Sequence, residues 1–90
     1  MDSQKFIQLA IRLVVEYFNK NVDVTNRAAL APEDVYVVWM CKTLGNNKAL
    51  LSTNVSDGMY YEITHNGAKG EIYLDAYKKW ENKCIKLTEV

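Results

Sequence analysis

The chain has 90 residues, 49% of them hydrophobic, and its eleven basic and eleven acidic residues cancel. This length predicts one small domain over residues 1–90 and excludes separate catalytic and regulatory domains. The balanced charge argues against long-range attraction to nucleic acid or to an anionic membrane.

The N-terminus, Met-Asp-Ser-Gln-Lys, lacks the basic start and apolar run of a signal peptide, and no apolar stretch reaches the length of a membrane span. Cys41 and Cys84 are far apart in the sequence, without a second pair nearby. Their spacing does not exclude a disulfide, but two free thiols in a reducing cytosol are favoured. We therefore expect a cytoplasmic protein with no membrane partner.

A helix is predicted at residues 3–19, because Asp2 or Ser3 can cap it and no glycine or proline interrupts it. Its apolar residues cover roughly twice the width that one surface helix needs. They fall on two adjoining flanks: Phe6, Leu9, Ala10, Leu13 and Tyr17, then Ile7, Ile11, Val14, Val15 and Phe18. The helix should therefore have two neighbours: the core face of a sheet, and either a C-terminal helix, which we favour, or a second copy of the chain.

The next segment, residues 19–31, is expected to be a connection with a short helical turn after Thr25. Pro32-Glu33-Asp34 is expected to be a turn that starts the first strand, because proline presets φ and lacks a donor.

The segment from residue 34 to residue 74 is rich in β-branched and aromatic residues and is divided by three turn signals. Asp57-Gly58 and Asn66-Gly67 are strong hairpin signals because both pairs tolerate positive φ. Gly45-Asn46-Asn47 is also turn-forming, with a two- or three-residue loop left open. The expected antiparallel meander has four strands: Val35–Leu44, Lys48–Val55, Met59–His65 and Ala68–Leu74.

Two-residue loops at all three turns would place Trp39 opposite Asn54, and Tyr60 opposite both Val55 and Tyr73. Alternation then gives two faces. The expected core face carries Val35, Val37, Trp39, Cys41, Leu50, Ser52, Asn54, Met59, Tyr61, Ile63, Ile72 and Leu74. The other carries Tyr36, Val38, Met40, Lys42, Leu51, Thr53, Val55, Tyr60, Glu62, Thr64, Lys69, Glu71 and Tyr73.

The second face has a charged margin around an apolar, tyrosine-bearing centre. One interpretation is an ordinary solvated face, since an antiparallel sheet can leave one side in water. The other is a partner surface, because large apolar patches are uncommon on monomers and tyrosine and methionine suit interfaces. The candidate protein-binding residues are Tyr36, Val38, Met40, Tyr60 and Tyr73. Homodimerisation through them would be the simplest version.

The last element is predicted to be a helix from about Asp75 to Ile85, with a short final strand at residues 84–87 as the alternative. Apolar residues recur at helical spacing and Asp75 can cap. These residues are Tyr73, Tyr77, Trp80, Cys84 and Leu87. The predicted fold class is thus α+β: an N-terminal helix, a four-stranded antiparallel meander and a C-terminal helix, with both helices packed on one face of the sheet.

No residue pattern indicates catalysis. His65 is the only histidine and lies beside a turn, without Ser-His-Asp spacing. Glu62 and Glu71 are expected to be cross-strand neighbours, but solvation or bridging by lysines is favoured over acid–base work. One histidine and two separated cysteines cannot make a structural zinc site, and residues 67–70 lack the spacing of a phosphate-binding loop. We expect no enzyme activity, cofactor, metal or small-molecule substrate.

Lys78, Lys79 and Lys83 form a basic flank on the predicted last helix. The order of helix, sheet and helix is similar to that of double-stranded-RNA-binding domains, with an additional strand. That family carries a lysine cluster at the start of its second helix, which Lys78 and Lys79 partly match, whereas Trp80 replaces a small residue. A nucleic-acid-binding module is therefore the alternative hypothesis.

Three segments, DVYVVWMCKTLGNNK (34–48), ALLSTNVSDGMYY (49–61) and YLDAYKKWENK (73–83), follow a single apolar helix. Together they resemble a family of small uncharacterised proteins encoded by phages and prophages of Gram-positive bacteria. The resemblance implies a phage accessory protein in the bacterial host cytoplasm, with no catalytic residues to carry over. Such proteins often occlude a host protein, which favours binding to a host protein or to a second copy.

Overall fold

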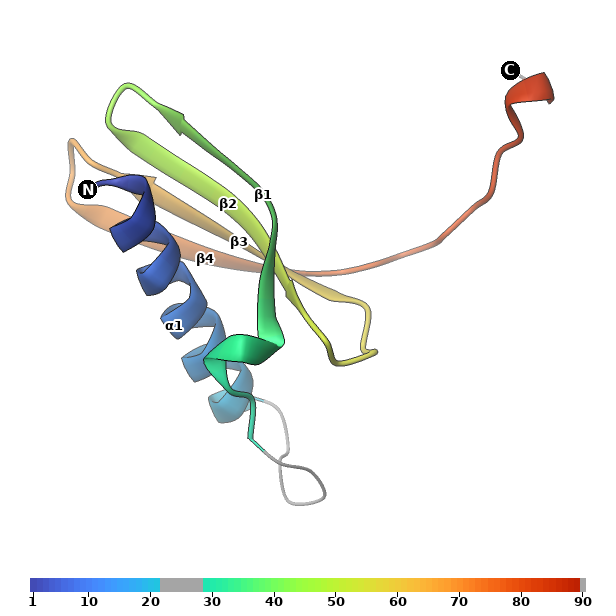
Figure 1. The fold of residues 1–90 in the computed structure, drawn as a ribbon, viewed down its shortest axis with the longest axis horizontal. Coiled ribbons are helices and arrows are strands. Elements are labelled where there is room, and N and C mark those ends of the chain that lie inside the picture. The colour runs from blue at the N-terminus through green and yellow to red at the C-terminus, as the bar shows by residue number, and fades with distance from the viewer. Residues whose placement is uncertain (22–28, 90) are drawn as a thin grey trace.

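The computed structural model describes residues 1–21 and 29–89. Its elements are α1 (Ser3–Asn21), the 3-10 helix η1 (Pro32–Asp34), β1 (Val35–Thr43), β2 (Asn46–Thr53), β3 (Met59–Asn66), β4 (Glu71–Lys78) and the 3-10 helix η2 (Leu87–Glu89). The strands form one antiparallel sheet in the order β1-β2-β3-β4, and α1 crosses one face of it (Figure 1). The N-terminal helix and the meander are confirmed, while the turn expected after Thr25 lies outside the described residues.

Helix α1 starts at a cap and packs through one stripe. The backbone N–H of Lys5 donates to Asp2 Oδ1 at 2.8 Å, which satisfies a donor of the first turn. Four side chains at every fourth position are fully buried: Phe6, Ala10, Val14 and Phe18. They join Ala49, Leu51, Tyr61 and Ile63 in the core. The stripe therefore places the helix over the two central strands.

The side chains of β2 lie on the opposite sides of the sheet from those expected. Leu51 and Thr53 are buried on the side of α1, although the assumed turns placed them on the uncovered face, and Leu50 and Ser52 lie on the other side. The cause is the connection between β2 and β3, which occupies residues 54–58 instead of Asp57-Gly58 alone. Leu51 therefore pairs with Tyr61, a register shifted by an odd number of residues. Such a shift turns every side chain of a strand over.

Contacts from outside the hairpin hold this longer loop. The backbone N–H of Asn54 donates to the carbonyl oxygen of Asp34 at 3.0 Å, and its amide Nδ2 donates to Asp34 Oδ1, also at 3.0 Å. At the other end of the loop, the N–H of Met59 donates to Asp57 Oδ1 at 3.0 Å. A residue twenty positions earlier thus fixes where β2 ends.

The first hairpin turns at Leu44-Gly45, where φ is 50° and 83°. Two successive positive φ values are typical of the two-residue turns that match strand twist. The register shifts between Val37 and Trp39, which makes Val38 the extra residue of a bulge. Trp39 consequently lies opposite Leu50 and not opposite Asn54 as expected.

The third hairpin turns through residues 67–70, four residues where two were expected. Tyr73 therefore pairs with Thr64, and Tyr60 with Tyr77, so the expected pairing of Tyr60 with Tyr73 is wrong. Because this shift is even, each residue of β4 keeps the face that was predicted for it.

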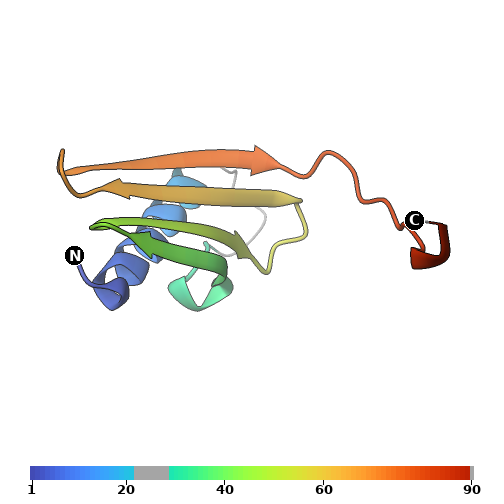
Figure 2. The same ribbon diagram turned by 90° about the horizontal axis from the view of Figure 1, so that it is seen from above.

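The predicted C-terminal helix is wrong. Strand β4 continues through the expected helix start at Asp75 as far as Lys78, and residues 79–86 form neither helix nor the alternative short strand. We call residues 79–89 the C-terminal arm. Figure 1 shows the arm leading away from the sheet beyond the end of β4, and Figure 2 shows the same from a second direction. The chain therefore gives α1 no C-terminal helix as its second neighbour.

Candidate protein-binding surface

The side of the sheet turned away from α1 is uncovered by any element in the described part of the chain. We call it the open face, and the strand registers define its members by alternation from the buried positions. They are Tyr36, Trp39, Cys41, Thr43, Asn46, Lys48, Leu50, Ser52, Tyr60, Glu62, Thr64, Asn66, Glu71, Tyr73, Asp75 and Tyr77.

Three of the predicted binding residues, Tyr36, Tyr60 and Tyr73, lie on the open face. Val38 is the extra residue of the β1 bulge. Met40 was placed on the wrong side, because the bulge reverses the alternation after Val37. Met40 lies directly opposite the buried Ala49, on the side of α1.

Sequence reasoning missed Trp39 and Tyr77, which the structure adds to the open face. Trp39 was assigned to the core, since nothing in the local sequence marks the bulge at Val38. Tyr77 was assigned to a helix. The alternation of Tyr73, Asp75 and Tyr77 was a strand signal that could have identified it.

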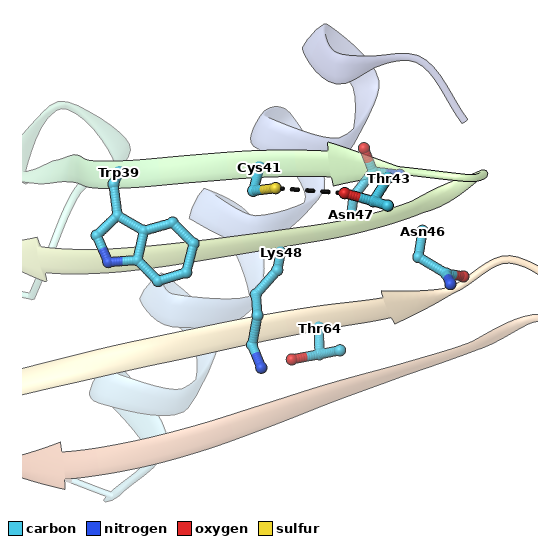
Figure 3. A pocket seen from close by; sticks show the side chains of 7 residues that line it. All are labelled: Trp39, Cys41, Thr43, Asn46, Asn47, Lys48 and Thr64. Carbon is cyan, nitrogen blue, oxygen red and sulfur yellow. Dashed lines mark hydrogen bonds between the residues drawn. The ribbon is translucent and has the colours of Figure 1, made fainter.

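A hollow of about 410 Å³ lies near the turn end of the first hairpin. Figure 3 shows side chains from three neighbouring strands around it, with α1 seen behind the sheet. Its lining residues are Trp39, Cys41, Thr43, Asn46, Asn47, Lys48 and Thr64. Cys41 Sγ lies 3.5 Å from Thr43 Oγ1 along one wall. The open face thus has a concave region next to the exposed indole ring of Trp39, and this region can accept a protruding side chain.

The open face carries excess negative charge. Lys48 is its one lysine, against Glu62, Glu71 and Asp75, and Lys48 Nζ lies 3.5 Å from Glu62 Oε1. Asp75 lies directly opposite Glu62 across the β3–β4 pair, which is an unfavourable like-charge placement. Glu71 lies opposite Asn66, so the expected pairing of Glu62 with Glu71 is wrong.

Glu71 also acts on the neighbouring tyrosine. A hydrogen bond from the Tyr73 hydroxyl to the Glu71 side chain, with smaller contributions from desolvation and the Glu71 charge, raises the pKa of Tyr73. The Tyr73 hydroxyl therefore stays protonated on the open face at physiological pH, and because its hydrogen is donated to Glu71, its oxygen can accept a hydrogen bond there.

The lysines proposed for nucleic acid binding do not lie on a helix. Lys78 ends β4 opposite Met59, and Lys79 and Lys83 belong to the C-terminal arm. The similarity to double-stranded-RNA-binding domains required a second helix that starts with these lysines. Without that helix, the hypothesis has lost its topological basis.

His65 is part of the helix side of the sheet. The Asn47 amide Nδ2 lies 3.2 Å from His65 Nδ1, and the His65 and Phe6 ring centroids are 6.4 Å apart. Asn47 Oδ1 is buried next to them and has no hydrogen-bond partner among the described residues. These contacts give the histidine a packing role at the edge of the core.

Two further properties concern the described residues. They contain no group of three or more histidine, cysteine, aspartate or glutamate side chains that could hold a metal ion, and no helix long and apolar enough to cross a membrane. Cys41 and Cys84 are both exposed free thiols.

Comparison with known proteins gives one match. Residues 7–87 match the model of a family of unknown function, DUF6275, and the match includes the arm as far as Leu87. No curated protein and no solved structure matches the chain.

Proposed function

Since this chain belongs to DUF6275, a family of unknown function, we propose from its own structure that it is a non-catalytic protein that binds a protein partner through the open face. One observation carries the proposal. Four large aromatic side chains, Tyr36, Trp39, Tyr73 and Tyr77, are each between 43% and 51% exposed on the open face, which no described element covers.

Aromatic residues support this reading through their energetics. Tyrosine and tryptophan are enriched at protein interfaces, where they combine a large contact area with a polar group that can still hydrogen-bond. Burial of apolar area contributes about 25 cal/mol per Å², so burying several half-exposed aromatic rings in an interface would stabilise it by several kcal/mol. Glu71 lies at the end of the edge strand β4 and would suit the polar rim of an interface, whereas Lys48 and Glu62 lie on the two central strands.

The sequence resemblance described above supports a more specific version of the proposal. In that version the protein is a phage or prophage accessory protein that acts in the cytoplasm of a bacterial host. Its partner is then a host protein or a second copy of the chain.

The proposal is tested by comparing three forms of the protein in capture experiments with bacterial cytoplasmic extract. They are the wild type, the open-face variant Tyr36→Asp/Tyr73→Asp, and a control, Gln4→Asp/Gln8→Asp. The control adds the same charge on exposed positions of α1, away from the open face. Captured proteins are cross-linked and quantified by mass spectrometry, and circular dichroism checks that all three forms are folded.

We expect a protein that is captured by the wild type and by the control to be reduced at least tenfold with the open-face variant. If a folded open-face variant captures it as well as the control does, the open face is not the binding surface and the proposal is wrong.

A further inference from the structure

The C-terminal arm is a second uncovered apolar surface of this chain. Trp80 is 98% exposed, Leu87 is 88% exposed and Ile85 is also exposed. A tryptophan normally buries 150–250 Å² of its surface in a fold or an interface. Among the residues that the structure describes, nothing in the same copy covers the open face or the arm.

The arm leaves the sheet in a direction that takes it away from its own open face. The N–H of Lys79 donates to the carbonyl oxygen of Gly58 at 2.7 Å, which extends the line of β4 by one residue. The arm contains neither glycine nor proline, the residues that most readily form a tight reversal. Figures 1 and 2 show the chain running outward from this point. The apolar arm residues are thus exposed at a distance from the sheet of their own copy.

We infer that the C-terminal arm of one copy lies across the open face of a second copy, and that the second copy returns the same contact. This arm-exchanged dimer rests on the proposed function, because it names the partner of the open face. A reciprocal contact of this kind closes with two-fold symmetry, the commonest symmetry of soluble oligomers.

The arm is long enough for this contact. Its eleven residues, 79–89, span up to about 36 Å when extended. A strand of eight residues, such as β4, is about 26 Å long. One arm can therefore cross the whole length of a partner's sheet and reach the hollow beside Trp39.

The charges of the two surfaces are complementary. The arm, residues 79–89, contains three lysines and two glutamates, a net charge of +1. The open face carries one lysine and three acidic residues, a net charge of −2. Lysines from a partner's arm would also relieve the like-charge placement of Glu62 and Asp75.

The buried area would suit a stable dimer. Each half of the dimer would bring together three apolar arm residues and four aromatic residues of the open face. At roughly 100 Å² for each side chain, two such halves bury on the order of 1,400 Å², within the usual range of about 1,200–2,000 Å² for specific interfaces. The family match extends to residue 87, so the arm is part of the sequence that the family model describes.

The first test is sedimentation equilibrium of the full chain. The wild type is expected to show twice the monomer mass of 10.3 kDa. The arm variant Trp80→Ser/Leu87→Ser should weaken dimerisation at least tenfold without a change in circular dichroism, since both side chains are exposed in their own copy. A control at polar arm positions, Asn82→Ser/Thr88→Ser, should remain a dimer.

The second test mixes the arm variant with the open-face variant Tyr36→Asp/Tyr73→Asp. Neither can dimerise alone if the arm binds the open face, but the mixture still contains one intact arm and one intact open face. The mixture should therefore form a heterodimer, weaker than the wild type because only one of the two contacts is intact. A dimer built from two open faces or from two arms would not be restored in this way.

Three results would overturn the inference: a wild type that stays monomeric at high concentration, an arm variant that dimerises like the wild type, or a mixture that stays monomeric while the wild type dimerises. In each case the capture experiment separates the two proposals. If the open-face variant still loses a captured protein, the proposed function stands and only the identity of the partner was wrong.

Discussion

The turn of the first hairpin offers a sharp test, because it places a leucine where the backbone disfavours one. Leu44 has a φ of 50°, in the left-handed region, and its side chain is 97% exposed. That region costs an L-residue about 1–2 kcal/mol, and asparagine tolerates it best after glycine. The exposed leucine side chain contributes almost no buried area in return. The substitution Leu44→Asn should therefore stabilise the fold.

The expected gain in the free energy of unfolding is about 1 kcal/mol. For a domain of this size, that gain corresponds to a rise of roughly 4–8 °C in the midpoint of thermal unfolding. Urea unfolding followed by tryptophan fluorescence and circular dichroism measures it directly. The protein concentration must be equal for all variants, because any dimerisation would make apparent stability depend on concentration.

The neighbouring residue provides a control of opposite sign. Gly45 has a φ of 83°, and a Cβ added there would meet nothing within 4 Å. Gly45→Ala therefore tests the backbone conformation alone, and it should lower the free energy of unfolding by about 1 kcal/mol. If Leu44→Asn gives no gain and Gly45→Ala no loss, the chain does not turn at these two residues, and the pairing of β1 with β2 is wrong as well.

Three further predictions concern other contacts. Asn19→Ala should lower the free energy of unfolding by about 2 kcal/mol in urea titrations, because the Asn19 amide donates to the Leu30 carbonyl at 3.0 Å and accepts from the Leu30 N–H at 2.8 Å. Gly67→Ala should cost about 1–3 kcal/mol in the same assay, since its Cβ would lie 2.6 Å from the backbone oxygen of Gly45. Burial, with a smaller contribution from the Asp57 carboxylate, raises the pKa of Tyr61 above its usual value of 10.0. The neutral Tyr61 side chain therefore contributes its full stabilisation below pH 10, and this stabilisation is lost as the pH rises through the pKa of the folded state. Above pH 10 the thermal midpoint of the wild type should therefore fall more steeply than that of Tyr61→Phe.

Each of these predictions has an outcome that contradicts it. A change below 0.5 kcal/mol for Asn19→Ala, within the usual range for surface substitutions, would mean that the two hydrogen bonds do not form. If Gly67→Ala leaves the free energy of unfolding unchanged, the turn of the third hairpin does not contact the turn of the first hairpin at Gly45. If the thermal midpoints of the wild type and Tyr61→Phe fall in parallel above pH 10, burial does not raise the pKa of Tyr61.

Local signals in the sequence were sufficient for the types of most elements. The uninterrupted apolar stripe of α1 and its cap at Asp2 predicted the first helix within two residues of its observed end at Asn21. The turn-forming pairs Asp57-Gly58 and Asn66-Gly67 marked the two later hairpins, although both loops proved longer than two residues. The existence and order of the four strands therefore followed from residues close together in the chain.

Side-chain orientation depends on contacts that no local pattern contains. The end of β2 is fixed by Asp34, which binds Asn54 through both backbone and side chain. The extra residue at Val38 reverses the alternation of β1 for the residues that follow it. An error of one residue at either place exchanges the two faces of a strand. For this reason the candidate site kept its tyrosines but wrongly included Met40 and missed Trp39.

The C-terminal segment shows why a helical pattern alone does not make a helix. An isolated helix of about eleven residues is marginal in water and needs a surface to cover its apolar stripe. Residues 75–78 instead gain backbone hydrogen bonds by pairing with β3, at the cost of placing Asp75 opposite Glu62. Beyond the Lys79 N–H, which donates to the Gly58 carbonyl oxygen, the described residues offer no further strand partner, and Trp80 and Leu87 stay exposed. The residues that suggested a packed helix are thus the ones that need an external cover. In the arm-exchanged dimer, Trp80 and Leu87 would lie on the open face of the second copy, and the positively charged arm of that copy would cover Tyr73 and Tyr77 and neutralise the acidic pair.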